Sequence, residues 1–257
     1  MADEYAADSA QISIEEKVED NDNVNSNTQI ADKESSDNVQ ASVITGKEDE
    51  DSVGDLPYIV FDTETTGLDS NKDRIVQLSM TKVFSTERKE QLDIFINPEL
   101  DREYQLQSKA YEIHNLHPDF LAKQKLFHEH AEEILKFFKG AKLVFGHNVR
   151  FDWKFLVAAF TRLGNNEDEG KPWIDLLKEI DFKLLDTLKM SRAAYPKPEL
   201  LRHRLKDVAE HLNINTKGLH NSMVDVEVTN KILINLMEKL SINFDDLSTD
   251  TKYFIPM

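Results

Sequence analysis

The chain contains no cysteine and, among its 257 residues, only 8 glycines and 7 prolines. Without cysteine it forms no disulfide, offers no thiolate ligand for zinc and has no cysteine nucleophile, which suits a reducing compartment. No apolar run approaches the roughly 20 residues of a membrane-spanning helix. The N-terminus, MADEYAADSA, lacks the apolar centre of a secretory signal. We therefore expect an intracellular, cytoplasmic protein with no membrane partner, and a nucleoid or nuclear location stays open.

Basic residues are outnumbered by acids: the chain has 31 Lys and Arg against 48 Asp and Glu, for a formal net charge of −17. Residues 1–55 hold 16 of these acids and only 3 lysines, whereas the rest of the chain holds 32 acids and 28 bases. Most of the excess charge therefore lies in the first fifth of the chain. This segment is too polar to offset the entropy of ordering, so we predict a disordered acidic leader. A solubilising role is favoured over a partner-binding one, since no amphipathic period appears in it.

Apolar patterning begins at residue 56. Three runs bounded by turn residues indicate strands, and their short connections predict an antiparallel meander. These runs are residues 56–62, 74–84 and 91–97.

Helical periods then dominate, interrupted by two further strand-like runs, at 141–148 and 181–187. Helices are predicted to end near Gly140 and Gly164, and the last long helix to cover residues 222–240. Strands followed by a strand–helix alternation predict an α/β fold, a mixed five-stranded sheet flanked by helices. We place one domain at 56–240, a short C-terminal tail at 241–257, and an exposed loop at 165–170.

Two carboxylates close the first strand, in the sequence FDTETTGLD. Side chains alternate along a strand, so Asp62 and Glu64 are expected to share one face. Like charges side by side are unfavourable unless a cation lies between them or one is protonated. The alternative is an ordinary solvated strand end, which a single Asp-x-Glu pattern does not exclude.

Two later stretches carry acids at the start of predicted helices. Asp152 in GHNVRFD could simply complement a helix macrodipole. In HNSMVD, His220 stands five residues before Asp225. Here a capping box formed by Ser222 and Asp225 is the alternative explanation. The order of the three stretches, each at an element end, favours a shared site.

Taken together, FDTETTGLD, GHNVRFD and HNSMVD resemble the motifs of the DEDDh 3′–5′ exonucleases, a family of the RNase H-like superfamily that includes proofreading subunits and RNase T. The segment YEIHNL also resembles the family's Ile-His-Gly segment, and the resemblance covers about residues 57–240. Asn115 stands where the family usually has glycine, and we expect the turn to survive because Asn tolerates left-handed backbone. Gln77 and Val149 replace a frequent acid and a frequent alanine.

A set of hard oxygen ligands without cysteine favours Mg²⁺ or Mn²⁺. The resemblance implies two ions, with Asp62, Glu64 and Asp225 on one and Asp152 supporting the other. It also implies that His220 is the general base, a role that suits histidine near neutral pH. The 3′-terminal nucleotide would contact Thr65, Leu68, His114, Asn148 and Phe151. Leu68 and Phe151 could instead be ordinary core residues.

Phosphate binding needs cations. Residues 189–206 hold six Lys and Arg and one acid, and Tyr195 among them could stack on a base. A solvated basic face is the equal alternative.

We therefore predict a metal-dependent 3′–5′ exonuclease that acts on nucleic acid with a free 3′ end, single strands preferred. DNA proofreading or repair is expected, with RNA trimming as the alternative and a non-catalytic binding module as a weaker one. A polymerase partnership stays open.

Overall fold

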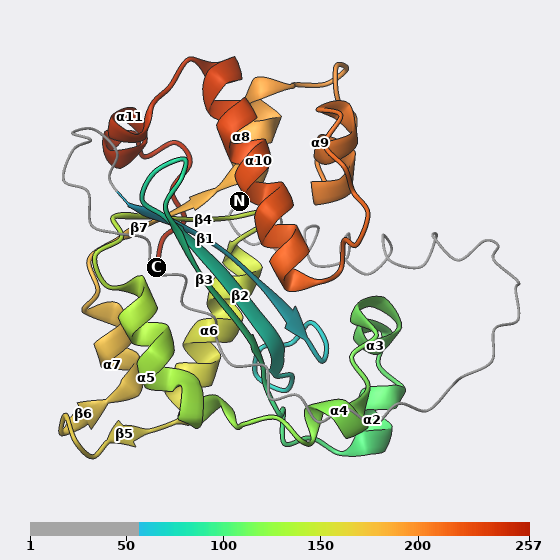
Figure 1. Ribbon diagram of the computed structural model, residues 1–257, viewed down its shortest axis with the longest axis vertical. Helices are drawn as coiled ribbons and strands as arrows, with labels where there is room; N and C mark the ends of the chain where they lie inside the picture. The colour runs from blue at the N-terminus through green and yellow to red at the C-terminus, as the bar shows by residue number, and fades with distance from the viewer. Residues whose placement is uncertain (1–56) are drawn as a thin grey trace, which may run out of the picture.

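The computed structural model describes residues 57–257, so the predicted acidic leader, residues 1–55, lies outside the described part. Its centre is a five-stranded mixed sheet of order β3-β2-β1-β4-β7 (Figure 1). Strand β1 is antiparallel to β2 and parallel to β4; β2–β3 is antiparallel and β4–β7 parallel. The predicted mixed five-stranded sheet is confirmed. The strands are β1 Tyr58–Thr65, β2 Ile75–Val83, β3 Lys89–Phe95, β4 Leu143–Gly146 and β7 Lys183–Asp186.

Helices cover both faces of the sheet. Ile59 and Phe61 of β1 pack in one apolar cluster and Tyr58 and Val60 in another, as strand alternation requires. The first cluster includes residues of α5 (Phe127–Phe138), α6 (Arg150–Arg162) and α7 (Trp173–Lys178). The second includes residues of α8 (Thr187–Ala194), α9 (Leu205–His211), α10 (Ser222–Leu240) and α11 (Phe244–Thr249). Figure 1 shows these two groups on opposite sides of the sheet.

Three short helices join β3 to α5, and periodicity did not predict them. They are α2 (Arg102–Leu106), α3 (Lys109–His114) and α4 (Pro118–Leu121). Each helix is capped at its start by a side chain that accepts a hydrogen bond from a main-chain N–H of the first turn; the capping residues are Asp101, Ser108 and His117. They lie together near the end of the sheet where β1 stops (Figure 1).

The helix ends at Gly140 and Gly164 agree with the prediction. Each glycine comes just after the end of a helix and has a left-handed backbone itself, with φ of +84° at Gly140 and +69° at Gly164. The segment 165–170, predicted as an exposed loop, is exposed except at Asn166, and it forms one strand and the turn of a hairpin of β5 (Asn165–Asn166) and β6 (Lys171–Pro172). Asn166 is buried, and its side-chain oxygen accepts bonds from the main-chain N–H groups of Asp168 and Glu169, which closes the turn.

The C-terminal segment, predicted as a short tail, packs against the domain. Leu247, Tyr253 and Ile255 are buried. The N–H of Ile255 donates to the oxygen of Leu184, 2.8 Å away, so the chain end covers the β7 edge of the sheet. Across residues 57–257, no helix is both long and apolar enough to cross a membrane.

Candidate active site

Three carboxylates meet at the end of β1. Asp62, Glu64 and Asp225 each offer an oxygen, and these oxygens lie within 4.8 Å of one another. Glu64 is only 4% exposed and Asp225 only 8%. Three acids this close, two of them buried and Asp62 half-buried, are unfavourable unless a cation or a proton offsets their charge. Hard carboxylate oxygens fit a divalent cation such as Mg²⁺ or Mn²⁺.

The start of α10 delivers Asp225 to this cluster. Asn221 caps the helix, because its side-chain oxygen accepts from the N–H groups of Met223 (3.1 Å) and Val224 (3.3 Å). The alternative capping box of Ser222 and Asp225 is therefore wrong. Ser222 Oγ instead donates to the main-chain oxygen of Asp62 at 2.7 Å, which joins α10 to β1.

Asp152 approaches β1 from the other face of the sheet. It lies in the first turn of α6, and its Oδ1 accepts from the N–H (3.0 Å) and hydroxyl (2.7 Å) of Thr63, the residue between Asp62 and Glu64. Burial raises the pKa of Asp152 to about 7, and the charge of Glu64 acts in the same direction. Asp152 is thus fixed beside the cluster, and direct metal binding by Asp152 stays a prediction.

His220 lies in the loop that precedes α10. Its backbone is left-handed, at φ +74°, and its N–H donates to Asp225 Oδ1 at 3.2 Å. A non-glycine residue with positive φ is uncommon, and such backbones concentrate at functional sites. The loop therefore holds His220 next to the carboxylate cluster, as the sequence led us to expect. Its role as base stays a prediction.

Gln77, on β2, lies between Glu64 of β1 and the edge strand β3. It pairs with Glu64 across β1 and β2, is 1% exposed, and donates from Nε2 to Asp93 at 2.8 Å. Its Oε1 accepts from the N–H of Ser222. A neutral amide here organises the start of α10 without adding another buried negative charge.

Two predicted substrate contacts, Thr65 and Leu68, lie within four residues after Glu64. Thr65 is buried and donates from its hydroxyl to the oxygen of Gly67 at 2.7 Å, while Leu68 is half-buried.

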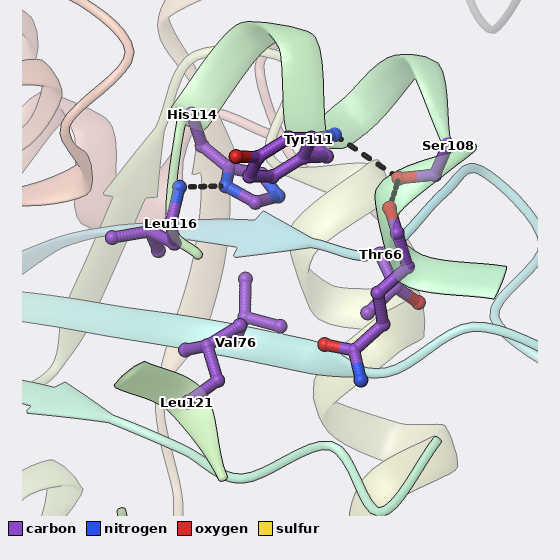
Figure 2. Close-up of a pocket in the computed structure, with 8 residues that line it drawn as sticks. Thr66, Val76, Ser108, Tyr111, His114, Leu116 and Leu121 are labelled. Atoms are coloured by element: carbon purple, nitrogen blue, oxygen red, sulfur yellow. Dashed lines mark hydrogen bonds between the residues drawn. The ribbon is translucent and has the colours of Figure 1, made fainter. Parts of the chain in front are cut away.

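His114 is the last residue of α3, and its Nδ1 accepts from the N–H of Leu116 at 2.9 Å. Figure 2 shows His114 beside Tyr111, in a small pocket whose wall includes Thr66 and Val76. Thus α3 lies against the end of β1, and substrate contact by these residues stays a prediction.

Asn148 and Phe151 flank the start of α6. Asn148 has left-handed backbone at φ +62°, and its N–H donates to Asp186 Oδ1 at 2.9 Å. The Phe151 ring lies 4.9 Å from that of Phe155 and packs on the apolar core. The packing role of Phe151 is therefore observed, and its contact with a nucleotide stays a prediction.

Behind Asn148 lies a buried polar group that the sequence did not single out. Asp186 accepts from Asn148 and from the N–H of Leu188, and burial raises its pKa to about 6. His147 contacts the Thr187 hydroxyl (2.9 Å) and the oxygen of His203 (2.8 Å), and burial lowers its pKa to about 4. A neutral His147 therefore carries its proton on Nε2, which donates to His203. The only sequence signal was their position at strand ends.

Two residues that depart from the family pattern, Asn115 and Val149, are compatible with the local structure around them. Asn115 ends α3 with left-handed backbone at φ +54°, as expected for Asn in place of glycine. Val149 is fully buried, and the backbone of Gly146 packs closely against it, since a Cβ built at Gly146 would lie 2.6 Å from Val149 Cγ2.

The basic stretch 189–206 is only partly available to a ligand. Tyr195 is 7% exposed and contacts the ring of His211, so the expectation that it stacks on a base is wrong. Lys189 donates to the oxygen of Phe254, and Arg204 pairs with Asp207 at 2.7 Å. The solvent-exposed cations of the stretch are Arg192, Lys197 and Arg202.

Comparison with known families identifies the chain. The exonuclease model named for RNase T matches residues 59–233, a span that contains all four motif acids and His220. The chain belongs to the DEDD-type 3′–5′ exonuclease family. The DNA polymerase III subunit epsilon of Rickettsia conorii is 32% identical over 194 residues, which are 71% of this chain and 74% of the relative.

Other relatives are much longer proteins. The PolC-type DNA polymerase III of Caldanaerobacter subterraneus is 27% identical over 198 residues, 77% of this chain but only 13% of that polymerase. Among solved structures, Escherichia coli exonuclease I in complex with a dT13 oligonucleotide has a TM-score of 0.62 at 20% identity, covering 76% of this chain and 44% of that one. Exonuclease X in complex with 5′-overhanging duplex DNA has a TM-score of 0.53 at 17% identity, covering 74% and 97%. These likenesses support the RNase H-like fold of this exonuclease.

Proposed function

We propose that this exonuclease hydrolyses DNA from the 3′ end in a reaction that requires Mg²⁺ or Mn²⁺. The observation that carries the proposal is the cluster of Asp62, Glu64 and Asp225, whose oxygens lie within 4.8 Å of one another. Such a cluster, in which Glu64 and Asp225 are buried and Asp62 is half-buried, costs folding free energy in the absence of a cation, and a bound divalent ion would offset that cost.

The residues divide the chemistry among them. Asp62, Glu64 and Asp225 would hold the ion, and Asp152 would support a second one from the α6 side. When bound there, the divalent ions would make the attacking water more acidic and would stabilise the negative charge of the phosphate oxygens. His220 takes the proton from the attacking water as the P–O3′ bond of the terminal phosphodiester breaks, and the leaving 3′ oxygen takes a proton from solvent water. A nucleoside 5′-monophosphate is released.

DNA is proposed as the substrate because the relatives and structural neighbours point to it. The relative in Rickettsia conorii is a DNA polymerase III subunit, and the exonuclease I structure contains a dT13 oligonucleotide. We propose a single-stranded 3′ end, with proofreading or repair in the cytoplasm or nucleoid as its setting. Thr65, Leu68, His114, Asn148 and Phe151 are proposed to hold the terminal nucleotide, because they lie at the end of β1 or in the elements beside it.

The test uses the purified chain of residues 1–257 and oligonucleotides labelled at either end. Single-stranded DNA, duplex DNA and single-stranded RNA are each incubated with Mg²⁺, Mn²⁺ or EDTA. The proposal predicts stepwise shortening of 5′-labelled DNA, immediate release of a labelled 3′ nucleotide, and no reaction in EDTA. Faster shortening of RNA would replace the DNA assignment by the RNA-trimming alternative. Full activity in EDTA would overturn the metal assignment.

A further inference from the structure

The loop that follows the metal-binding strand is wound around one buried carboxylate. Asp73 is 5% exposed, and its carboxylate accepts hydrogen bonds from the Thr66 hydroxyl at 3.1 Å and from the N–H of Asp69 at 2.9 Å. The backbone closes the same loop, because the N–H of Thr66 donates to the oxygen of Arg74 and the N–H of Arg74 to the Thr66 hydroxyl. The loop that bears Leu68 is therefore held at both ends and in the middle.

Gly67 shows how tightly the loop is wound. A Cβ built at this position would lie 2.5–2.6 Å from the three carboxyl atoms of Asp73, which no real Cβ tolerates. The carboxylate of Asp73 thus packs directly against the backbone of Gly67. Gly67 comes two residues after Thr65 and one residue before Leu68. Any shift of Asp73 is transmitted to both predicted nucleotide contacts.

The same carboxylate reaches a second segment. Tyr104, on α2, donates its hydroxyl to Asp73 Oδ1 at 2.7 Å, and this bond raises the pKa of Tyr104, so the hydroxyl stays a donor at neutral pH. Two residues beyond α2, Ser108 caps α3, which ends at His114. Figure 2 shows Ser108, Tyr111 and His114 around the pocket that Thr66 also lines. Asp73 therefore joins the loop of Leu68 to the helix pair that leads to His114.

We propose that Asp73 and Tyr104 form a clamp that sets the spacing between the loop of Thr65 and Leu68 and the helix that carries His114, and so determines how tightly the 3′-terminal nucleotide is bound. The proposal rests on the proposed function, because it assigns the terminal nucleotide to these two segments. Both residues are positioning residues: neither touches the carboxylate cluster, so the clamp acts on substrate binding and leaves the chemical step unchanged.

The test replaces Tyr104 with phenylalanine, which removes the hydroxyl and keeps the ring. Tyr104 is 46% exposed, so we expect the variant to fold like the wild type, which its urea unfolding curve checks. Steady-state kinetics on a 5′-labelled single-stranded DNA with Mg²⁺ should show KM raised about 3- to 10-fold, the size of one lost hydrogen bond, with kcat unchanged. Affinity for the same strand, measured with Ca²⁺ in place of Mg²⁺, should fall by the same factor.

Asp73→Asn and the double variant make the test specific. Asn keeps the shape of the side chain but turns an NH₂ group toward one of the donors, so KM should rise at least as far as in Tyr104→Phe. Because both changes break one contact, adding Tyr104→Phe to Asp73→Asn should raise KM by less than it does alone. Gln107→Ala, which removes an exposed side chain from the end of α2, is the matched control and should leave KM unchanged.

The outcomes separate the clamp from the proposed function. No metal-dependent release of 3′ nucleotides by the wild type would overturn the proposed function and the clamp with it. An active wild type with an unchanged KM in Tyr104→Phe would overturn the clamp alone. A fall in kcat at constant KM, or full additivity in the double variant, would do the same.

Discussion

The hydroxyl of Ser222 donates to the main-chain oxygen of Asp62 over 2.7 Å, so the first turn of α10 is bonded to the strand whose acids it completes. The residues are 160 positions apart in the chain. Ser222 is fully buried, and the bond fixes how close Asp225 lies to Asp62 and Glu64.

Ser222→Ala should therefore reduce activity and stability together. The variant leaves a buried carbonyl without its donor, which costs about 1–2 kcal/mol of unfolding free energy. We expect kcat to fall by about tenfold, because small displacements of catalytic groups are expensive. Urea unfolding and single-turnover kinetics measure the two effects. Ser191→Ala is the control: Ser191 is equally buried but bonds within α8, to Leu188. Equal losses of kcat in both variants would show that Ser222 has no special role.

His220→Ala should lower the single-turnover rate by about 10²–10⁴, the contribution of a positioned acid–base group. Affinity for single-stranded DNA in Ca²⁺ should change little, and the acid limb of the pH–rate profile should disappear. His128, exposed on α5, gives the matched control His128→Ala, which should behave like the wild type. A His220→Ala variant that keeps the wild-type rate and acid limb would mean that another group takes the proton.

Asp186 should make stability depend on pH. Burial raises its pKa from 3.8 to about 6 in the folded chain. Between about pH 4 and pH 6 the folded state keeps a proton that the unfolded state has lost, so the free energy of unfolding falls as pH rises through this window and then levels off. Asp186→Asn keeps an oxygen for the N–H groups of Asn148 and Leu188 but does not ionise. We expect the variant to gain on the order of 2–3 kcal/mol over the wild type between pH 4 and pH 7.

Urea unfolding in EDTA at several pH values measures this difference. Asp245→Asn, an exposed acid on α11, should show no such gain. A constant difference between Asp186→Asn and the wild type across the range would show that Asp186 is ionised throughout in the folded chain.

Arg202 should contribute to phosphate binding. It is exposed and adjoins His203, whose oxygen accepts from His147, the residue before Asn148. Arg202→Ala should flatten the dependence of log Kd on log salt by about 0.7 for a single strand. Lys142 precedes β4, at the strand end opposite to the site, and Lys142→Ala is the control. Equal slopes for Arg202→Ala and the wild type would place the cationic track elsewhere.

Long periodic elements could be predicted from the sequence, because their signal extends over many residues. Helix α10 was predicted with the observed ends, and β1 and β2 were placed within a few residues. Helices α2, α3 and α4 are only 4–6 residues long and cover little more than one turn. Their formation depends on side-chain caps and on contacts with the sheet, which no local period reports.

The carboxylates of the site were predicted because each ends or begins an element. The contact that positions them was not, because its partners are distant: Ser222 and Asp62 are 160 positions apart. The same holds for the contact of Asp73 with Tyr104, which lies 31 residues away. Tyr195 was misjudged since its neighbours are basic. It follows α8 and contacts His211 of α9, so its ring is buried among apolar residues of both helices and α10.

The central claim is that Asp62, Glu64 and Asp225 together hold the ion that makes this chain an exonuclease. The most direct measurement is single-turnover release of the 3′ nucleotide from single-stranded DNA by Asp62→Asn, Glu64→Gln and Asp225→Asn, alongside Mn²⁺ titration of each variant. Each change should reduce release by at least about 10³-fold and weaken Mn²⁺ binding, while the metal-free melting temperature stays equal or rises because like charges are removed. Near-normal release or unchanged Mn²⁺ binding in any of the three would contradict the account.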